Sequence, residues 1–513
     1  MGRFSLGRRA GLLLPLSCVR NARGDLACYT DAGGVAKFLR AAGCTLWQLL
    51  PLNEIAGGSD SPYGANSSHA LEPVYIDLAA CEDVGALRPE EEQRLAEARE
   101  KDRVDFGLIR GVKRAALARG WERFRDRELR KGSERAAAFA RFRESKQGWL
   151  ADYTLYRALH DERRVSWRDW EPGLRDREPN ALEGARRGYG DVIDRLAWMQ
   201  WIAYEQWCRG RADANALGVK VVGDLPFMVA GDSADVWGLQ RFFGFDATVG
   251  VPPDAYSAEG QDWGLPVPQW EAMREAGDPW LTPRADTAAE LYDAYRVDHV
   301  VGLYRTYARP IDRAKAYFLP AEEAAQRAQG ERILRLFGSR ADVLAEDLGT
   351  VPDFVRASLA EQGIPGTKVL RWEIDQGVPR DPRKFPRASL CVTGTHDTES
   401  LASWWEALPE RERKLQLQQE PLRGLQGEDA SRFTERTRKA FLELAYGSSS
   451  DALLTPITDA LGLRDRINLP GTVGPHNWTW RLAFRLPELE SRPEPLAIVQ
   501  HLAHLAGRTG RTP

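Results

Sequence analysis

The stretch Tyr295-Arg296-Val297-Asp298-His299 decides how the rest of the sequence is interpreted. It is typical of a buried β-strand, in which side chains alternate between two faces, so Arg296 and Asp298 share one face. A guanidinium within about 4–6 Å of a carboxyl group favours its charged form, which is the form that a nucleophile needs. An isolated Arg-x-Asp is more often a structural ion pair. A catalytic role for Asp298 therefore requires partner residues from other stretches of the chain.

Three further apolar runs end in acids in the same way. They are 219–226 with Asp224, 342–349 with Glu346, and 390–397 with Asp397. Helical patterns separate these runs, and strands alternating with helices indicate a parallel sheet covered by helices. In a barrel of eight βα units, catalytic groups lie at the carboxyl ends of the strands, where these acids fall. We therefore predict an α/β fold, a (β/α)8 TIM barrel with inserted, largely helical subdomains.

An open, doubly wound sheet is the alternative fold. It usually binds nucleotides, yet the chain has no G-x-G-x-x-G or P-loop motif at a strand-helix junction. At 513 residues the chain exceeds one ordinary hydrophobic core. We expect residues 1–85 to hold the first barrel strands and an active-site loop, 86–182 an inserted helical subdomain, and 183–513 the remainder of the barrel. A lid insertion is expected around 230–275, without regular structure because of its many prolines and glycines. After residue 400 the pattern is mostly helical.

Composition narrows the possible ligands. The 71 basic and 74 acidic residues nearly cancel, which favours neither nucleic acid nor a membrane surface as a partner. No apolar run approaches the roughly 18 residues of a membrane span, and the six cysteines are scattered, so we expect a cytoplasmic protein with reduced thiols. The seven histidines form no H-x-x-x-H pair, and no metal is expected. The 17 tryptophans favour a carbohydrate ligand, because indole faces stack on sugar rings.

Asp298, Glu346 and Asp397 together suit the cleavage of a glycosidic bond. Retaining enzymes need a carboxylate that attacks the anomeric carbon and a carboxylic acid about 5–5.5 Å away that protonates the leaving oxygen. Asp298 beside Arg296 suits the first role. Glu346 suits the second, because its apolar strand would raise its pKa. Asp397 could hold ring hydroxyls. A structural cap explains any one of these acids equally well.

Several motifs occur in one order from about Gly11 to Arg481. They are Trp-Gln-x-Leu-Pro-Leu, Ser-Pro-Tyr, Gly-Asp-x-Pro, Asp-Ser-x-Asp-Val-Trp, Val-Pro-Pro-Asp, Arg-x-Asp-His, Ala-Glu-Asp-Leu-Gly, Thr-Gly-Thr-His-Asp, and the segment 466–472 with Asn477-Trp478. In these motifs the chain resembles the 4-α-glucanotransferases called amylomaltases or disproportionating enzymes.

This resemblance implies a barrel enzyme that acts on α-1,4-glucans and maltooligosaccharides without a cofactor. It implies Asp298 as the nucleophile, Glu346 as the acid/base and Asp397 as the transition-state stabiliser. The substrate-binding residues that it implies are Ser61, Tyr63, Asp224, Gln261, Trp263, Arg296, His396 and Asn468. We expect a monomer or a weak homodimer. The alternatives are a retaining hydrolase of the α-amylase type, which would admit water, and an inactive glucan-binding paralogue.

The chain also departs from the family pattern. Val300-Val301 replaces Phe-Arg, and an asparagine is replaced by Leu265, by Thr398 and by Glu72. All three carboxylates are kept. The departures bear on the binding of the acceptor, on how tightly the lid holds the glucan, and on the balance of transfer over hydrolysis.

Overall fold

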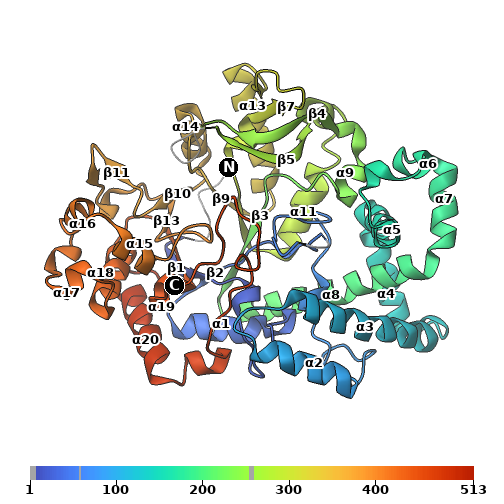
Figure 1. The fold of residues 1–513 in the computed structure, drawn as a ribbon, viewed down its shortest axis with the longest axis horizontal. Coiled ribbons are helices and arrows are strands. Elements are labelled where there is room, and N and C mark those ends of the chain that lie inside the picture. The colour runs from blue at the N-terminus through green and yellow to red at the C-terminus, as the bar shows by residue number, and fades with distance from the viewer. Residues whose placement is uncertain (1–6, 57–58, 254–258, 513) are drawn as a thin grey trace.

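A closed barrel of eight parallel strands organises the chain. The computed structural model describes residues 7–56, 59–253 and 259–512. The barrel strands follow the order β1-β14-β13-β10-β9-β6-β3-β2, which confirms the predicted (β/α)8 fold (Figure 1). Their bounds are β1 Arg9–Leu13, β2 Leu46–Gln48, β3 Lys220–Leu225, β6 Ala294–Val297, β9 Asp342–Ala345, β10 Gly366–Val369, β13 Ser389–Val392 and β14 Ala452–Pro456.

Alternating apolar side chains fill the barrel interior. They form a cluster of their own, made of Leu46, Val222, Ala294, Leu344, Val369, Leu390, Val392, Ala452 and Leu454. The intervening positions on the same strands, such as Val221 and Val343, join the larger core beneath the outer helices. Both faces of each strand are therefore buried, which explains why these stretches read as continuous apolar runs.

Strand β14 contradicts the expectation of a mostly helical segment after residue 400. It pairs with β1 and β13 and closes the barrel. Its five residues lie between α18 (Glu435–Tyr446) and α19 (Ile457–Leu461). A buried run this short cannot be told from part of a helix by periodicity alone, so only its pairing partners define it as a strand.

The segment 232–264 also differs from its prediction, because it contains regular structure. β4 (Phe243–Val251) and β5 (Gln261–Pro268) are antiparallel, and with β7 (Thr306–Pro310) and β8 (Tyr317–Leu319) they form a sheet in the order β5-β4-β7-β8. The prolines are accommodated because β5 is an edge strand. Gly250 lies at a register shift, and a Cβ there would be 2.1 Å from the carbonyl oxygen of Gln261. We call these four strands the lid sheet; it lies at the top of Figure 1.

Helices pack around the barrel and beside it. Between β2 and β3, helices α2 to α7 gather beside the barrel (Figure 1). Their bounds are α2 Pro89–Glu100, α3 Phe106–Phe124, α4 Glu134–Ser145, α5 Gln147–Arg163, α6 Pro172–Arg175 and α7 Pro179–Gly188. That this stretch is a subdomain bounded at residues 86 and 182 stays a prediction.

The remaining helices connect the strands of the barrel and the lid sheet, apart from α20, which follows the last strand. They are α1 Ala32–Ala41, α8 Gly190–Ala216, α9 Ala234–Gly238, α10 Trp270–Glu275, α11 Leu281–Leu291, α12 Val301–Tyr304, α13 Glu323–Gly338, α14 Asp353–Gln362, α15 Leu401–Ala407, α16 Glu410–Gln416, α17 Glu428–Ser431 and α20 Pro493–Arg508. Over the described ranges, none of the helices is both long enough and apolar enough to span a membrane.

Candidate active site

Three acids predicted from the sequence line one cavity at the carboxyl ends of the barrel strands. Asp298 follows β6, Glu346 follows β9, and Asp397 lies in the loop between β13 and α15. The cavity has a volume of about 300 Å³, and its wall also includes Arg296, Gln261 and residues of the lid sheet. Parallel strands bring their carboxyl ends to one rim, so residues about fifty positions apart meet there.

Arg296 joins Asp298 to a fourth acid, Asp224. Its Nη1 donates to both carboxylate oxygens of Asp224, at 2.7 and 2.9 Å, and its Nη2 lies 2.9 Å from Oδ1 of Asp298. Asp224 has no exposed surface, and Arg296 is 7% exposed. Burial opposes the charge on Arg296, but Asp224 and Asp298 outweigh it and raise its pKa well above the usual value. The ion pair predicted from Arg-x-Asp is therefore present, with a second carboxylate on the neighbouring strand.

Glu346 accepts two backbone hydrogen bonds. The N–H of His299 donates to Oε2 at 2.7 Å, and the N–H of Leu348 donates to Oε1 at 3.2 Å. Burial raises the pKa of Glu346, Arg296 lowers it, Asp298 raises it, and the two N–H groups lower it; the net value is about 7. Near neutral pH this carboxyl group is thus populated in both forms, as a group that first gives and later takes a proton requires.

Tyr63 and His396 connect Asp224 to Asp397, although Tyr63, His396 and Asp224 are not part of the cavity lining. The Tyr63 hydroxyl donates to Oδ2 of Asp224 at 2.9 Å and lies 3.0 Å from Nε2 of His396. Because its single hydrogen goes to Asp224, this hydroxyl accepts the Nε2–H of His396. The same nitrogen is 3.3 Å from Oδ2 of Asp397, and the Asn468 amide donates to Oδ1 of Asp397 at 2.6 Å. Residues from three loops and from strand β3 thus share one hydrogen-bonded chain.

These partners hold Asp397 in its ionised form. Burial by itself raises the pKa of this carboxyl group, but His396, the Asn468 amide and Arg296 outweigh burial and lower the pKa to about 2. Burial likewise opposes the charge on His396, whereas Asp397 stabilises it and raises the pKa of the imidazole. Glu346 and Asp397 therefore hold protons with very different affinities in one cavity.

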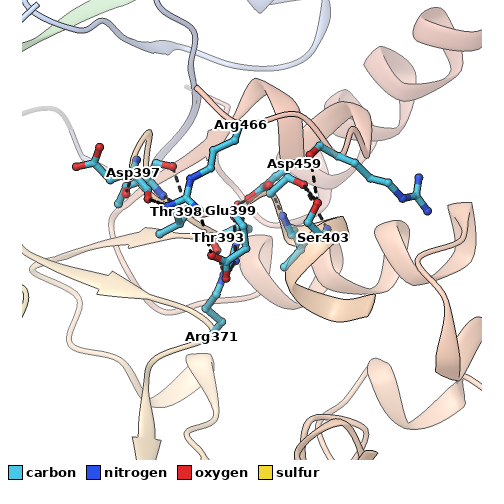
Figure 2. A network of polar contacts seen from close by, with 12 residues as sticks. Arg371, Thr393, Asp397, Thr398, Glu399, Ser403, Asp459 and Arg466 are labelled. Carbon is cyan, nitrogen blue, oxygen red and sulfur yellow. Dashed lines mark hydrogen bonds and ion pairs between the residues drawn. The ribbon is translucent and has the colours of Figure 1, made fainter. Parts of the chain in front are cut away.

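A polar network behind Asp397 supports its loop (Figure 2). Arg371 follows β10 and is 3% exposed; its Nε donates to the Thr393 carbonyl and its Nη1 to the Glu399 carbonyl, both at 3.0 Å. Asp459 accepts the Thr393 hydroxyl at 2.6 Å and the Leu401 N–H at 2.7 Å. Both ends of the loop are therefore fixed to neighbouring strands and helices.

Arg466 links this loop to the one that carries Asn468. Its Nε donates to the Asn468 carbonyl at 2.6 Å, and its Nη2 donates to the Asp397 carbonyl. Its Nη1 is 3.8 Å from a carboxylate oxygen of Glu399. The side chains of Asp397 and Asn468 are hydrogen-bonded to each other, so one guanidinium holds the backbones of an interacting pair.

The lid sheet supplies one wall of the cavity. Gln261 and Trp263 on β5 line it, and the Trp263 ring lies 4.8 Å from the His299 ring in an edge-to-face arrangement. Tyr307, Phe318 and Trp372 also line the cavity but were absent from the predicted site. The first two lie on β7 and β8, which the sequence pattern did not reveal. Trp372 ends the apolar run 367–372, just beyond the carboxyl end of β10, a position that could have indicated it.

Ser61 and three of the departures have local structural roles. The Ser61 hydroxyl accepts the N–H of Tyr63 at 3.4 Å and so shapes the loop that carries that ring. Glu72 accepts the N–H groups of Ile55 and Val74 at 2.8 and 3.2 Å. Thr398 accepts the Thr395 N–H at 3.0 Å within the Asp397 loop. Val300 and Val301 are buried against the core. We find no structural reason for Leu265.

Comparison with known proteins identifies the family. The 4-alpha-glucanotransferase family model matches residues 14–486. The chain belongs to the 4-alpha-glucanotransferase family. It is 33% identical to the 4-alpha-glucanotransferase of Thermus thermophilus over 496 residues, covering 93% of this chain and 95% of that protein. It is 31% identical to a chloroplastic/amyloplastic 4-alpha-glucanotransferase of Oryza sativa subsp. japonica, covering 93% and 80%.

A solved structure agrees with this assignment. The amylomaltase from Streptococcus agalactiae, in complex with acarbose, superposes with a TM-score of 0.85 and 25% identity, and the match covers 98% of this chain and 99% of that one. The chain is therefore an enzyme of the 4-alpha-glucanotransferase class, and both the resemblance and the enzyme class predicted from the sequence are confirmed.

Proposed function

We propose that this 4-alpha-glucanotransferase moves α-1,4-glucan segments by a retaining double displacement through a covalent glycosyl-Asp298 intermediate. The donor is a maltooligosaccharide or a starch- or glycogen-type glucan, and the acceptor is the 4-hydroxyl of another glucan or of glucose. The reaction uses no cofactor. The covalent route, the substrates and the roles of individual residues are the proposal; the class of enzyme follows from the family.

The observation that carries the proposal is the separation of proton affinities within one cavity. Glu346 has a pKa of about 7, whereas Asp397 has a pKa of about 2, and Asp298 lies 2.9 Å from the Arg296 guanidinium. Carboxyl groups whose surroundings separate their pKa values in this way divide the acid and base roles. Glu346 is suited to exchange a proton, and the other two are suited to act as anions.

In the first step, a carboxylate oxygen of Asp298 attacks the anomeric carbon of the donor. The bond from that carbon to the glycosidic oxygen breaks, and the leaving oxygen takes the proton of Glu346. In the second step, Glu346 takes the proton of the acceptor's 4-hydroxyl, whose oxygen forms the new glycosidic bond as Asp298 leaves. Asp397 stabilises the positive charge that develops on the sugar ring in both transition states.

The other predicted residues bind the glucan in this proposal. Tyr63 stacks under the sugar that is attacked, and Arg296, His396, Asp224 and Asn468 complete its subsite. Ser61 supports that subsite from the Tyr63 loop. Gln261 and Trp263 contact the chain from the lid sheet. The Streptococcus agalactiae amylomaltase in complex with acarbose supports a ligand site in this fold.

Incubation with maltotriose tests the activity. Transfer predicts a ladder of longer oligosaccharides together with glucose, resolved by mass spectrometry. Glucose and maltose with no longer product would instead support the hydrolase alternative, because water would then be the acceptor. An activated donor whose glycosyl group is transferred only slowly from the enzyme to an acceptor should leave that group on the peptide that contains Asp298. Its absence, together with no turnover of maltotriose, would support the inactive paralogue.

A further inference from the structure

His299 lies between the lid sheet and the side chain of Glu346. Its ring makes edge-to-face contacts with Trp263 of β5, at 4.8 Å between ring centroids and 81°, and with Phe227, at 5.6 Å and 66°. Its own backbone N–H donates to Oε2 of Glu346 at 2.7 Å. One residue therefore touches the lid sheet through its ring and Glu346 through its backbone.

The backbone of His299 is held in an uncommon conformation. Its φ is +45°, in the left-handed region that non-glycine residues seldom adopt and that costs free energy. The neighbouring backbone is tied to Glu346 on both sides, because the Val300 N–H donates to the Glu346 carbonyl at 3.1 Å and the Glu346 N–H donates to the Val297 carbonyl at 3.0 Å. The two ring contacts help to offset this strain. Without them, the backbone conformation that directs the His299 N–H toward Glu346 would be less stable.

His299 is unsuited to act as the acid itself. Burial lowers the pKa of its imidazole to about 4, so the ring is neutral near neutral pH. The charged groups that face Glu346 are Arg296 and Asp298, with Arg305 and Asp397 elsewhere in the same cavity wall. None of these charges lies on β5, and the contact from Trp263 reaches Glu346 through the neutral ring and backbone of His299.

We propose that His299 is a positioning residue that transmits the docking of the lid sheet to Glu346. The inference rests on the proposed acid/base role of Glu346. When Trp263 packs on the His299 ring, the His299 N–H holds Oε2 of Glu346 toward the cavity. Gln261 and Trp263 line the same cavity, so a glucan chain lying against them favours the docked arrangement. Proton transfer is then fastest with a glucan in place, which favours transfer over hydrolysis.

The variants His299→Asn and Trp263→Leu test this connection. Asparagine tolerates a positive φ but has no ring, and His299→Phe keeps the ring as the conservative control. Activity is measured with maltotriose and with 4-nitrophenyl α-maltotrioside, whose leaving group needs no proton. We expect His299→Asn to lower kcat/KM about tenfold for maltotriose and less than twofold for the activated donor. His299→Phe should restore most of the loss.

The pH profile provides an independent readout. The N–H of His299 stabilises the Glu346 carboxylate and lowers its pKa, so a weakened hydrogen bond raises that pKa. The acid must be protonated, so the basic limb of kcat/KM should move to higher pH in His299→Asn and in Trp263→Leu. The double variant should be no worse than the poorer single variant, because both substitutions break the same connection.

Equal losses of kcat/KM for both donors, together with a basic limb at the same pH as in the parent, would overturn the inference. His299 would then have only a structural role. Glu346→Gln separates this result from a failure of the proposed function. If Glu346→Gln does not discriminate between the two donors, its acid role fails. If it discriminates and the His299 variants do not, only the present inference fails. Thermal unfolding checks each variant. If His299→Asn does not fold, the basic limb of Trp263→Leu carries the test, because Trp263 also contacts the glucan and its loss lowers kcat/KM for both donors.

Discussion

At the scale of single residues, Arg296 organises the charges of the site. One guanidinium pairs with the buried Asp224 and with Asp298. Burying Asp224 without a cation would be strongly unfavourable, so Arg296 is needed for folding of this region as well as for the orientation of Asp298. The Arg-x-Asp pair in the sequence is therefore both a structural ion pair and part of the cavity wall.

Replacing the attacking group tests the proposed nucleophile. Asp298→Asn should lower kcat for maltotriose by about four orders of magnitude or more, because an amide oxygen is a poor nucleophile. Binding of maltooligosaccharides, measured by isothermal titration calorimetry, should change little. Retained turnover would show that another group attacks the anomeric carbon.

The pKa of Glu346 predicts the pH dependence of the reaction. The acid must be protonated in the first step, and its pKa is about 7, so kcat/KM for maltotriose should fall as the pH rises through about 7. Values of kcat/KM measured in a series of buffers at constant ionic strength define this basic limb of the pH profile. In Glu346→Gln, the limb should vanish from the residual activity on maltotriose. A limb that persists in that variant belongs to a different group.

At the scale of elements, loops from distant parts of the chain complete the site. The loop after β13 carries Asp397, and the loop after α19 carries Asn468 and Arg466. Arg466 bridges the two backbones, and Arg371 with Asp459 holds the first loop from behind. The position of Asp397 thus depends on contacts that none of the barrel strands supplies alone.

Removing the bridge should disturb catalysis more than stability. Arg466→Met should lower kcat by about 10- to 100-fold, because a shift of about 1 Å in Asp397 is enough for such a loss. The melting temperature should change little, since Arg466 is partly exposed. Arg464→Met is the matched control, because Arg464 pairs with Glu406 outside the cavity lining. Similar kcat losses in the two variants would contradict this account.

At the scale of the whole molecule, the two ends of the described chain close the barrel together. Arg511 has no exposed surface and donates to the carbonyls of Tyr446 and Ser448, at 3.0 and 2.8 Å, and to that of Arg9, at 3.3 Å. These acceptors lie beside β1 and β14, near the amino ends of the strands. The contacts are therefore on the opposite end of the barrel from the cavity.

This arrangement predicts a variant that loses stability and keeps activity. Arg511→Ala removes one buried guanidinium that donates to several carbonyl oxygens and should lower the free energy of unfolding by about 3 kcal/mol. Urea denaturation measures the change, and kcat at 25 °C should stay within about twofold of the parent. Arg508→Ala is the control, because Arg508 is an exposed partner of Glu443. A large loss of kcat in Arg511→Ala would argue against the separation of the two barrel ends.

The sequence by itself determined the barrel class and the acids at the strand ends. Alternation along a strand and the position of an acid after an apolar run are local properties, so Arg296, Asp298 and Glu346 could be recognised without knowing the fold. The apolar strand also predicted the raised pKa of Glu346, and burial is the largest cause of that rise.

Only the tertiary structure decided which residues meet. The contacts of Tyr63 with Asp224 and His396 join positions 161 and 333 residues apart, and no local pattern encodes such pairs. The same holds for β14 and the lid sheet, because a short run becomes a strand only through partners whose register is set elsewhere. Trp263 reaches His299 for that reason: the edge strand that carries it exists only when β4 pairs with it.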